Sequence, residues 1–409
     1  MKKIISIGIV FVIITTMLTS IYVRAEESNE VPNPEVITDS AGYYEENSCN
    51  GIPDPNYEDI SRMKVIDHSI YYLDNNEYVC IEFFNTEEFA LNATEITVKD
   101  YIDGIPVTRV NGAVINYKNK NCYSKLTKVN IPSTVKIIGT RAFSKLKKIT
   151  ELYLPDSITK IGSWAFSDTN IKKINIPRKL EYSPYGFAGM NKLKSIVIPK
   201  EIDCVSQGFF NSNTSLEKVV FESNNYRYIT DGVFAYCKSL KKINFTKGLT
   251  GIDDRAFYES GLTGKIIIPK KCHFIGESAF FGCKNLTKVN FMGKNIKVSD
   301  YAFNGCNKIK SIKGTENITR FGEVVFGCKL LKNFTISKNL KAIKKETFYF
   351  CKNIKKLKIL TTNTKVFKTK DIFKGISKKC KVYVKTYKMK NKVRKSGFKG
   401  EIFVNKKLK

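Results

Sequence analysis

The feature that most constrains this chain is a motif that recurs through most of its 409 residues. The motif reads L-x-x-I-x-I-P, a short polar turn, I-x-x-I-G-x-x-A-F and a polar run that often contains Cys. A fixed period of this size is typical of a solenoid, in which each repeat packs only on its neighbours. The aromatic residue that ends the motif, here the anchoring phenylalanine, returns every 21–25 residues, at Phe143, Phe166, Phe187, Phe210, Phe234, Phe257, Phe280, Phe303, Phe326, Phe348 and Phe373.

The first half of each repeat predicts a short strand with one buried face. In the segment 126–132, Val129 and Ile131 alternate with polar residues, and we call them the first and second inward residues. Proline ends the strand because it lacks the N–H that a β-ladder needs. This proline occurs at Pro132, Pro155, Pro177, Pro199 and Pro269.

The second half of each repeat predicts a return across the core. Gly162 allows either a positive φ or close packing in the bend, Ala165 leaves room for the next repeat, and Phe166 fills the centre. We therefore expect a β-rich repeat solenoid of about twelve repeats of 21–25 residues. Short strands should form one face, and turns or short helical segments the other.

Some repeats depart from the motif. Ile115 occupies the aromatic position of an atypical first repeat, as expected where something must cover the open end of a stack. Ser183-Pro184 replaces the Ile-Gly pair, Phe209 replaces the Ala before Phe210, and the segment 261–264 reshapes a loop. We expect local irregularity at these places rather than a break in the array.

Sequences outside the repeats differ in character, and together they suggest five regions. The basic start and long apolar run of the N-terminus predict a cleaved signal peptide, and an uncleaved membrane anchor is the alternative. Cleavage would leave no transmembrane segment. The C-terminal sequence predicts a strand at 381–384, a short helix at 387–396 and a strand at 402–404. The regions are a signal peptide (1–25), an acidic disordered leader (26–62), an N-terminal β cap with a partial first repeat (63–110), the solenoid (111–375) and a basic C-terminal cap (376–409).

Charge is high and uneven along the chain. The formal net charge is +31, but residues 26–100 hold 18 acids and 3 bases, about −15. Residues 341–409 hold 24 bases and 3 acids. This asymmetry favours an anionic partner or an acidic segment lying on the basic array, although charge also keeps a long repeat protein soluble.

Cysteine usage predicts buried thiols rather than a metal site. The chain has 11 cysteines and only two histidines, His68 and His273, and it contains no C-x-x-C. Several cysteines share one position, two or three residues after the anchoring phenylalanine, where a small buried thiol fills a tight turn. Disulfide pairing along the stack is the alternative. The cysteines at this position are Cys237, Cys283, Cys306, Cys328 and Cys351.

The strand-end I-P and the I-G-x-x-A-F that follows it resemble the BspA-type, or treponemal-type, leucine-rich repeat family over about residues 93–373. The resemblance implies a leucine-rich-repeat solenoid that is secreted or held at the cell surface. It also implies a role in adhesion or protein–protein interaction. It carries over no binding residue.

Candidate binding residues are those that the core does not need. Residues flanking the inward pair face outward on a strand, and seven of the eleven that precede the first inward residue are Lys. Stacked repeats would bring these like charges close together, which favours an anionic ligand above them. The candidates are Lys128, Tyr153, Lys173, Lys218, Lys242, Lys265, Lys288 and Lys356.

Motifs for catalysis are missing. The chain contains no G-x-S-x-G, H-E-x-x-H or phosphate-binding loop, and we read Asp253-Asp254 as a surface pair. We therefore expect no enzyme, cofactor or metal, and the signal peptide argues against nucleic acid. The expected partners are extracellular or cell-surface proteins. The alternative is a structural, charge-anchored protein of the cell wall that binds teichoic acid or acidic polysaccharide.

Overall fold

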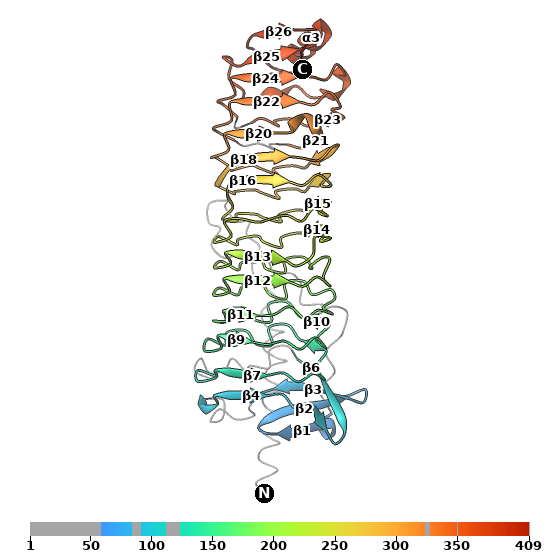
Figure 1. Ribbon diagram of the computed structural model, residues 1–409, viewed down its shortest axis with the longest axis vertical. Helices are drawn as coiled ribbons and strands as arrows, with labels where there is room; N and C mark the ends of the chain where they lie inside the picture. The colour runs from blue at the N-terminus through green and yellow to red at the C-terminus, as the bar shows by residue number, and fades with distance from the viewer. Residues whose placement is uncertain (1–58, 84–90, 112–122, 324–327, 350, 409) are drawn as a thin grey trace, which may run out of the picture. The chain divides into compact units, whose positions relative to one another are not determined.

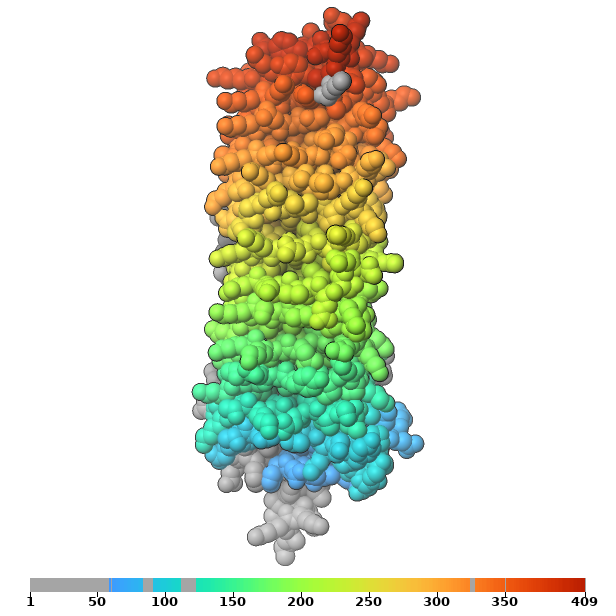
Figure 2. Space-filling model, viewed as in Figure 1, coloured from blue at the N-terminus to red at the C-terminus, as the bar shows by residue number. Residues whose placement is uncertain are grey.

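The computed structural model describes residues 59–83, 91–111, 123–323, 328–349 and 351–408. The predicted signal peptide, most of the acidic leader, Ile115 and Phe326 lie outside these residues. The described repeats stack in chain order (Figure 1). Successive repeats form successive bands on the surface (Figure 2). The predicted β-rich leucine-rich-repeat solenoid is confirmed.

The first half of each repeat supplies the strand face, a row of parallel strands that carries the predicted inward residues. Strands from successive repeats pair in register. The row is divided into short sheets rather than one continuous ladder. Three of these sheets have two strands: β4 (Glu95–Thr97) with β7 (Lys128–Asn130), β9 (Glu151–Leu152) with β11 (Lys173–Ile174), and β12 (Ser195–Ile198) with β13 (Lys218–Phe221). A three-stranded sheet contains β16 (Thr263–Ile268), β18 (Asn285–Phe291) and β20 (Ser311–Lys313). A four-stranded sheet contains β22 (Asn333–Ile336), β24 (Lys356–Ile359), β25 (Lys381–Val384) and β26 (Ile402–Val404).

The second half of each repeat forms a second row of shorter parallel strands. The pattern predicted turns or short helical segments here, and the structure has both turns and two- to four-residue strands. Short 3-10 helices occur at η2 (Thr315–Asn317), η3 (Thr364–Val366) and η4 (Asp371–Phe373). The strands are β8 (Ile137–Ile138), β10 (Lys160–Ile161), β14 (Tyr228–Ile229), β15 (Gly251–Ile252), β17 (Phe274–Ile275), β19 (Ile296–Val298), β21 (Ile318–Phe321) and β23 (Ala342–Ile343).

An antiparallel hairpin precedes the repeats. Strands β1 (Met63–Ile66), β2 (Ser69–Asp74) and β3 (Glu77–Glu82) pair antiparallel, and β3 then pairs with β6 (Ile105–Val110), which also pairs with β5 (Tyr101–Ile102). Both Asn75 and Asn76 have positive φ, as a two-residue hairpin turn requires. A tight two-residue turn therefore connects β2 and β3.

The C-terminal elements follow the sequence prediction closely. Strands β25 and β26 occupy the predicted ranges, and helix α3 (Tyr387–Lys395) connects them. The Thr386 hydroxyl accepts a hydrogen bond from the Met389 N–H and begins the helix. Met389 and Val393 are buried against the last repeats.

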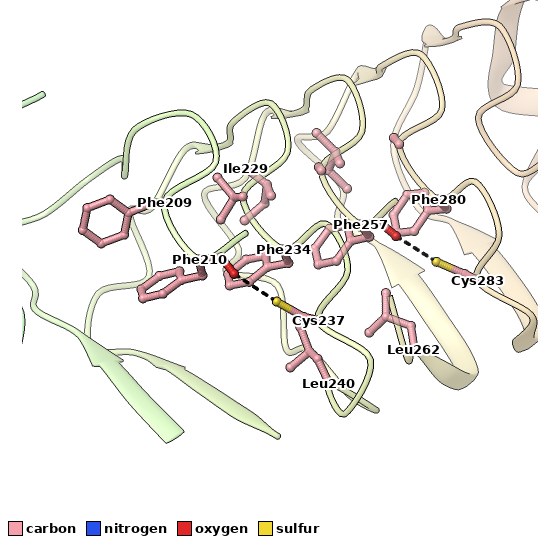
Figure 3. Close-up of a cluster of buried hydrophobic side chains, with 14 of the residues drawn as sticks. Phe209, Phe210, Ile229, Phe234, Cys237, Leu240, Phe257, Leu262, Phe280 and Cys283 are labelled. Carbon is pink, nitrogen blue, oxygen red and sulfur yellow. Dashed lines mark hydrogen bonds between the residues drawn. The ribbon is translucent and has the colours of Figure 1, made fainter. Parts of the chain in front are cut away.

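Anchoring phenylalanines form a stack through the centre of the solenoid. Phe257 and Phe280 lie nearly parallel, with ring centroids 5.2 Å apart (Figure 3). Phe280 and Phe303 are also nearly parallel, with centroids 4.9 Å apart. At the N-terminal end, the Phe83 ring lies 6.0 Å from Phe143. A residue from the hairpin thus continues the stack beyond the first described anchoring residue.

In the repeats from Phe143 to Phe303, the turn around the anchoring phenylalanine uses the left-handed backbone region on both sides. In the repeat of Phe257, Arg255 and Glu259 have φ of 49° and 50°. The N–H groups of Arg255, Phe257 and Glu259 all donate to carbonyls of the next repeat, at 2.8 Å. A positive φ costs an L-residue about 1–2 kcal/mol, and these hydrogen bonds between repeats offset that cost. The same conformation recurs two residues before the ring at Arg141, Trp164, Tyr185, Gly208, Gly232, Ser278, Tyr301 and Glu346.

Glycine in the I-G-x-x-A-F motif serves close packing. A Cβ on Gly162 would lie 2.4 Å from the backbone nitrogen of Thr140 in the preceding repeat. Gly162 is not among the residues with positive φ. Of the two roles predicted for this glycine, the structure therefore supports the close approach of backbones.

Two predicted irregularities have physical explanations. At Ser183-Pro184 the second strand row is interrupted between β10 and β14. The Ser183 hydroxyl accepts from the Ile161 N–H at 3.0 Å, and the Ser206 hydroxyl accepts from the Ser183 N–H at 2.7 Å. Side-chain oxygens therefore replace backbone carbonyls, and the stack continues through the interruption.

Phe209 is accommodated by a glycine in the repeat before it. Phe209 contacts Phe187 with ring centroids 4.9 Å apart, and a Cβ on Gly186 would lie only 3.3 Å from the Phe209 ring. Gly186 stands where other repeats have Ala, so the large and small residues compensate each other. Because the Phe209 ring lies against both Phe187 and Phe210, those two rings meet at 61° rather than in parallel.

The repeated cysteines form a column of buried free thiols, as predicted. The Cys237 thiol donates to the Phe210 carbonyl at 3.2 Å, and the Cys283 thiol to the Phe257 carbonyl at 3.1 Å (Figure 3). Burial raises the pKa of Cys237 and of Cys283 to about 12. Each thiol thus links a turn to the repeat before it and is held in the unreactive protonated form.

Replacing a stacked ring should destabilise the whole array. We expect Phe280→Ala to lower the free energy of unfolding by about 3–5 kcal/mol, because the fully buried ring contacts a ring on each side. Urea denaturation followed by circular dichroism measures this change. The exposed Lys284→Ala provides the control, and a loss below about 1 kcal/mol for Phe280→Ala would contradict the central role of the stack.

Thiol labelling should report which cysteines are protected. In a variant with Cys49 and Cys122 changed to Ser, the native protein should react slowly with a disulfide reagent, and only at exposed Cys204. The Cys204 sulfur is itself partly buried, and this burial, with Asp203 and Asp253 nearby, raises the pKa of the thiol to about 11. The thiolate is the reactive form, so the labelling rate should rise as pH increases from 8 towards 11. Rapid labelling of several thiols at pH 8 would show that the column is accessible.

Candidate functional site

The outward residues that precede the first inward residues form a row along the strand face, here called the lysine row. Strand register brings Lys265 beside Lys288 and Lys288 beside Ser311. Lys242 follows the same pattern, although its segment does not form a hydrogen-bonded strand. The row contains Lys128, Glu151, Lys173, Ser195, Lys218, Lys242, Lys265, Lys288, Ser311, Asn333 and Lys356.

Three lysines of this row already have partners. Lys128 lies 2.8 Å from a carboxylate oxygen of Glu95, and Lys173 lies 2.7 Å from one of Glu151. Hydrogen bonds from Lys128 and Asn130 hold the pKa of Glu95 below its usual value. The Lys356 ammonium lies 5.2 Å from the centre of the Tyr383 ring, in cation–π geometry.

The middle of the row is different. Within the described ranges, no carboxylate lies in ion-pair distance of the remaining four lysines of the row. All four are exposed, and they occupy consecutive repeats. Neighbouring strands are about 4.8 Å apart, so the like charges of this segment have no internal compensation. The four residues are Lys218, Lys242, Lys265 and Lys288.

Apolar side chains lie next to this charged segment on the same face. Tyr153 is 71% exposed, Val197 45% and Ile267 44%. Each stands between the two inward residues of its repeat, two positions after the residue of the lysine row. The strand face therefore offers apolar contact area beside uncompensated positive charge. Val220 occupies an equivalent position but is only partly exposed.

A pocket interrupts the strand face between β20 and β22, and we did not predict it. In the repeat of β20, Gly314 stands where the neighbouring repeats have the second inward residues Phe291 and Ile336. Gly314 has a φ of 76°, and a Cβ there would lie 2.0 Å from the Phe291 carbonyl oxygen. The missing side chain and the turn η2 leave β20 and β22 in separate sheets. A pocket of about 290 Å³ opens between them.

Other potential chemistry gives no site in the described ranges. Asp254 is exposed, and its carboxylate accepts a hydrogen bond from the Glu277 N–H at 2.6 Å. Partial burial, with Asp254 and Asp231 nearby, raises the pKa of Asp253. Among the described residues there is no cluster of three or more potential metal ligands. The described part of the chain also has no helix long and apolar enough to span a membrane.

Family comparison agrees with the repeat geometry. A family model described as "BspA type Leucine rich repeat region (6 copies)" matches overlapping segments at residues 115–226, 183–264, 209–326 and 252–379. The chain belongs to the BspA-type leucine-rich repeat family. No curated protein was found to match the sequence significantly.

Solved structures of leucine-rich repeat and surface proteins are similar to this chain at low sequence identity. A leucine-rich repeat protein from Bacteroides ovatus ATCC 8483 is 21% identical with a TM-score of 0.51, and the match covers 84% of this chain and 99% of that one. The pneumococcal vaccine antigen PcpA is 16% identical, with a TM-score of 0.45 and coverages of 84% and 98%. A leucine rich cell surface protein from Faecalibacterium prausnitzii A2-165 is 18% identical, with a TM-score of 0.41 and coverages of 81% and 97%. Family and fold are thus those of a repeat scaffold.

Changing a lysine of the lysine row to glutamate should raise or lower the free energy of unfolding, depending on the charge of the neighbouring residue in the row. Lys265→Glu places a carboxylate next to Lys288, so we expect stabilisation of about 0.2–1 kcal/mol at low salt. Lys173→Glu would face Glu151 and should destabilise the protein by a similar amount. Thermal unfolding at low and high salt measures both effects. Equal changes in the unfolding temperature of the two variants would contradict the absence of charge compensation around Lys265.

Proposed function

We propose that this protein is a secreted or cell-surface scaffold that binds extracellular proteins, and so mediates adhesion or protein–protein interaction, through its strand face. The observation that carries the proposal is the exposed apolar side chains of Val197 and Ile267 beside the uncompensated lysines of consecutive repeats. Protein interfaces combine apolar anchors, which supply most of the affinity, with a charged rim that guides association.

The repeat architecture supports a binding role over a structural one for this face. A solenoid needs its inward residues for the core, and apolar residues in the outward row add nothing to that core. The cell-surface description of the Faecalibacterium protein agrees with an extracellular location. The signal peptide expected at residues 1–25 would deliver the chain there.

A second candidate is charge-held attachment to an acidic wall polymer such as teichoic acid. The observation that favours it is the run of 24 bases and 3 acids in residues 341–409. Attachment by charge alone should fall steeply as ionic strength rises, whereas recognition with apolar contacts should persist. Salt dependence therefore separates the two candidates.

Binding of the chain without residues 1–25 to immobilised matrix proteins and to purified cell wall, at low and high salt, tests the proposal. We expect salt-resistant matrix binding that weakens about tenfold or more when Val197 and Ile267 are both changed to Asp. Changing all four uncompensated lysines to Ser should slow association and reduce its salt dependence.

A control variant changes four exposed lysines away from the strand face to Ser, which alters the net charge equally. These lysines are Lys271, Lys294, Lys297 and Lys345. Equal loss of binding in the control and the strand-face variant would contradict a role for the strand face. Wall binding that salt abolishes, without matrix binding, would favour the second candidate.

A further inference from the structure

The pocket between β20 and β22 has a lining with mixed chemistry. Lys313 and Glu316 are exposed and carry opposite charges, and in the described part of the chain neither forms an ion pair. Asn333 and Thr335 add an amide and a hydroxyl from the facing strand. Its remaining lining is Ile312, Gly314, Thr315 and Phe334, of which Thr315 and Phe334 are each 3% exposed.

We propose that this pocket binds one uronic acid residue of an acidic polysaccharide. A pocket of about 290 Å³ can take a single pyranose ring. The ammonium of Lys313 would pair with the carboxylate of the sugar. Neighbouring hydroxyl groups would donate to the Glu316 carboxylate and exchange hydrogen bonds with Asn333 and Thr335.

The presence of Glu316 selects among anions. A phosphodiester has acceptor oxygens but no hydrogen to donate, so a carboxylate in the pocket would repel it. A hydroxylated acid satisfies both charges, since its carboxylate meets Lys313 and its hydroxyls meet Glu316. The lining therefore favours an acidic sugar over a plain phosphate polymer.

The surface around the pocket can hold the rest of such a chain. Strands β20, β24 and β25 contain lysines, β22 contains none, and none of the four strands contains Asp or Glu. Successive strands are about 4.8 Å apart, close to the length of one sugar ring in an extended polysaccharide. In a polymer whose acidic and neutral sugars alternate, further carboxylates would then lie over lysines of every second repeat. The lysines on or directly before these strands are Lys310, Lys313, Lys332, Lys355, Lys356, Lys358 and Lys381.

This site is separate from the residues assigned to protein binding. The segment from Lys218 to Lys288 lies in earlier repeats, and none of its side chains lines the pocket. Only the source of the polysaccharide, outside the cell, rests on the proposed function. The two proposals can therefore fail independently, and the variant with four lysines changed to Ser should retain sugar binding.

Calorimetry with a hexasaccharide of alternating glucuronic acid and N-acetylglucosamine tests the inference. We expect the intact chain to bind it and to bind the carboxyl-reduced form at least tenfold more weakly. Thr335→Trp should fill the pocket and weaken binding at least tenfold. Asn290→Trp, at the equivalent position two repeats earlier, does not line the pocket and should leave binding unchanged.

Two further arms distinguish specific recognition from general charge. Glu316→Gln should weaken binding of the hexasaccharide and strengthen binding of inorganic polyphosphate, which has no hydroxyl groups along its chain, because it removes a negative charge and weakens the acceptor for hydroxyls. Circular dichroism verifies that each variant is folded. The inference is overturned by equal binding of the reduced sugar, by equal effects of the two tryptophans, by polyphosphate binding as tight as that of the hexasaccharide, or by no binding.

Discussion

In-register stacking of one repeat on the next is the interaction on which the rest of this structure depends. No repeat can bury both sides of its own ring, so each anchoring phenylalanine needs a ring or an aliphatic side chain above and below it. The same stacking supplies backbone partners for the turns. In the repeat of Phe257, three N–H groups in and around a left-handed turn donate to the following repeat.

Stacking also determines where function can reside. Because the register repeats, any residue type that recurs in an outward position becomes a row along the solenoid. The lysines from Lys218 to Lys288 form such a row without carboxylate partners among the described residues, whereas Lys128 and Lys173 are neutralised by glutamates of adjacent repeats. A change from Glu to Lys at a single outward position thus decides whether the charge of a neighbouring lysine is paired within the solenoid or available for a partner.

Sequence periodicity predicted the architecture well, because the core positions of a solenoid repeat with the chain. The strands, the Phe stack, the buried thiols and the C-terminal β25–α3–β26 unit follow from local patterns. The ion pairs of Lys128 and Lys173 could not be read from one repeat, because each depends on register with another. Phe83 beside Phe143 was missed because it comes from the hairpin rather than from a repeat. The pocket had a sequence signal, Gly314 in place of an inward aliphatic or aromatic residue, but its opening also required the turn at η2.

Lysine footprinting tests the central claim, that the strand face is the binding face, most directly. The intact chain would be acetylated free and bound to an immobilised extracellular matrix extract, and the modified lysines would be identified by mass spectrometry. We expect protection of Lys218, Lys242, Lys265 and Lys288 on binding, with Lys271, Lys294, Lys297 and Lys345 unchanged. Binding that protects the second group and leaves the first fully reactive would contradict that claim.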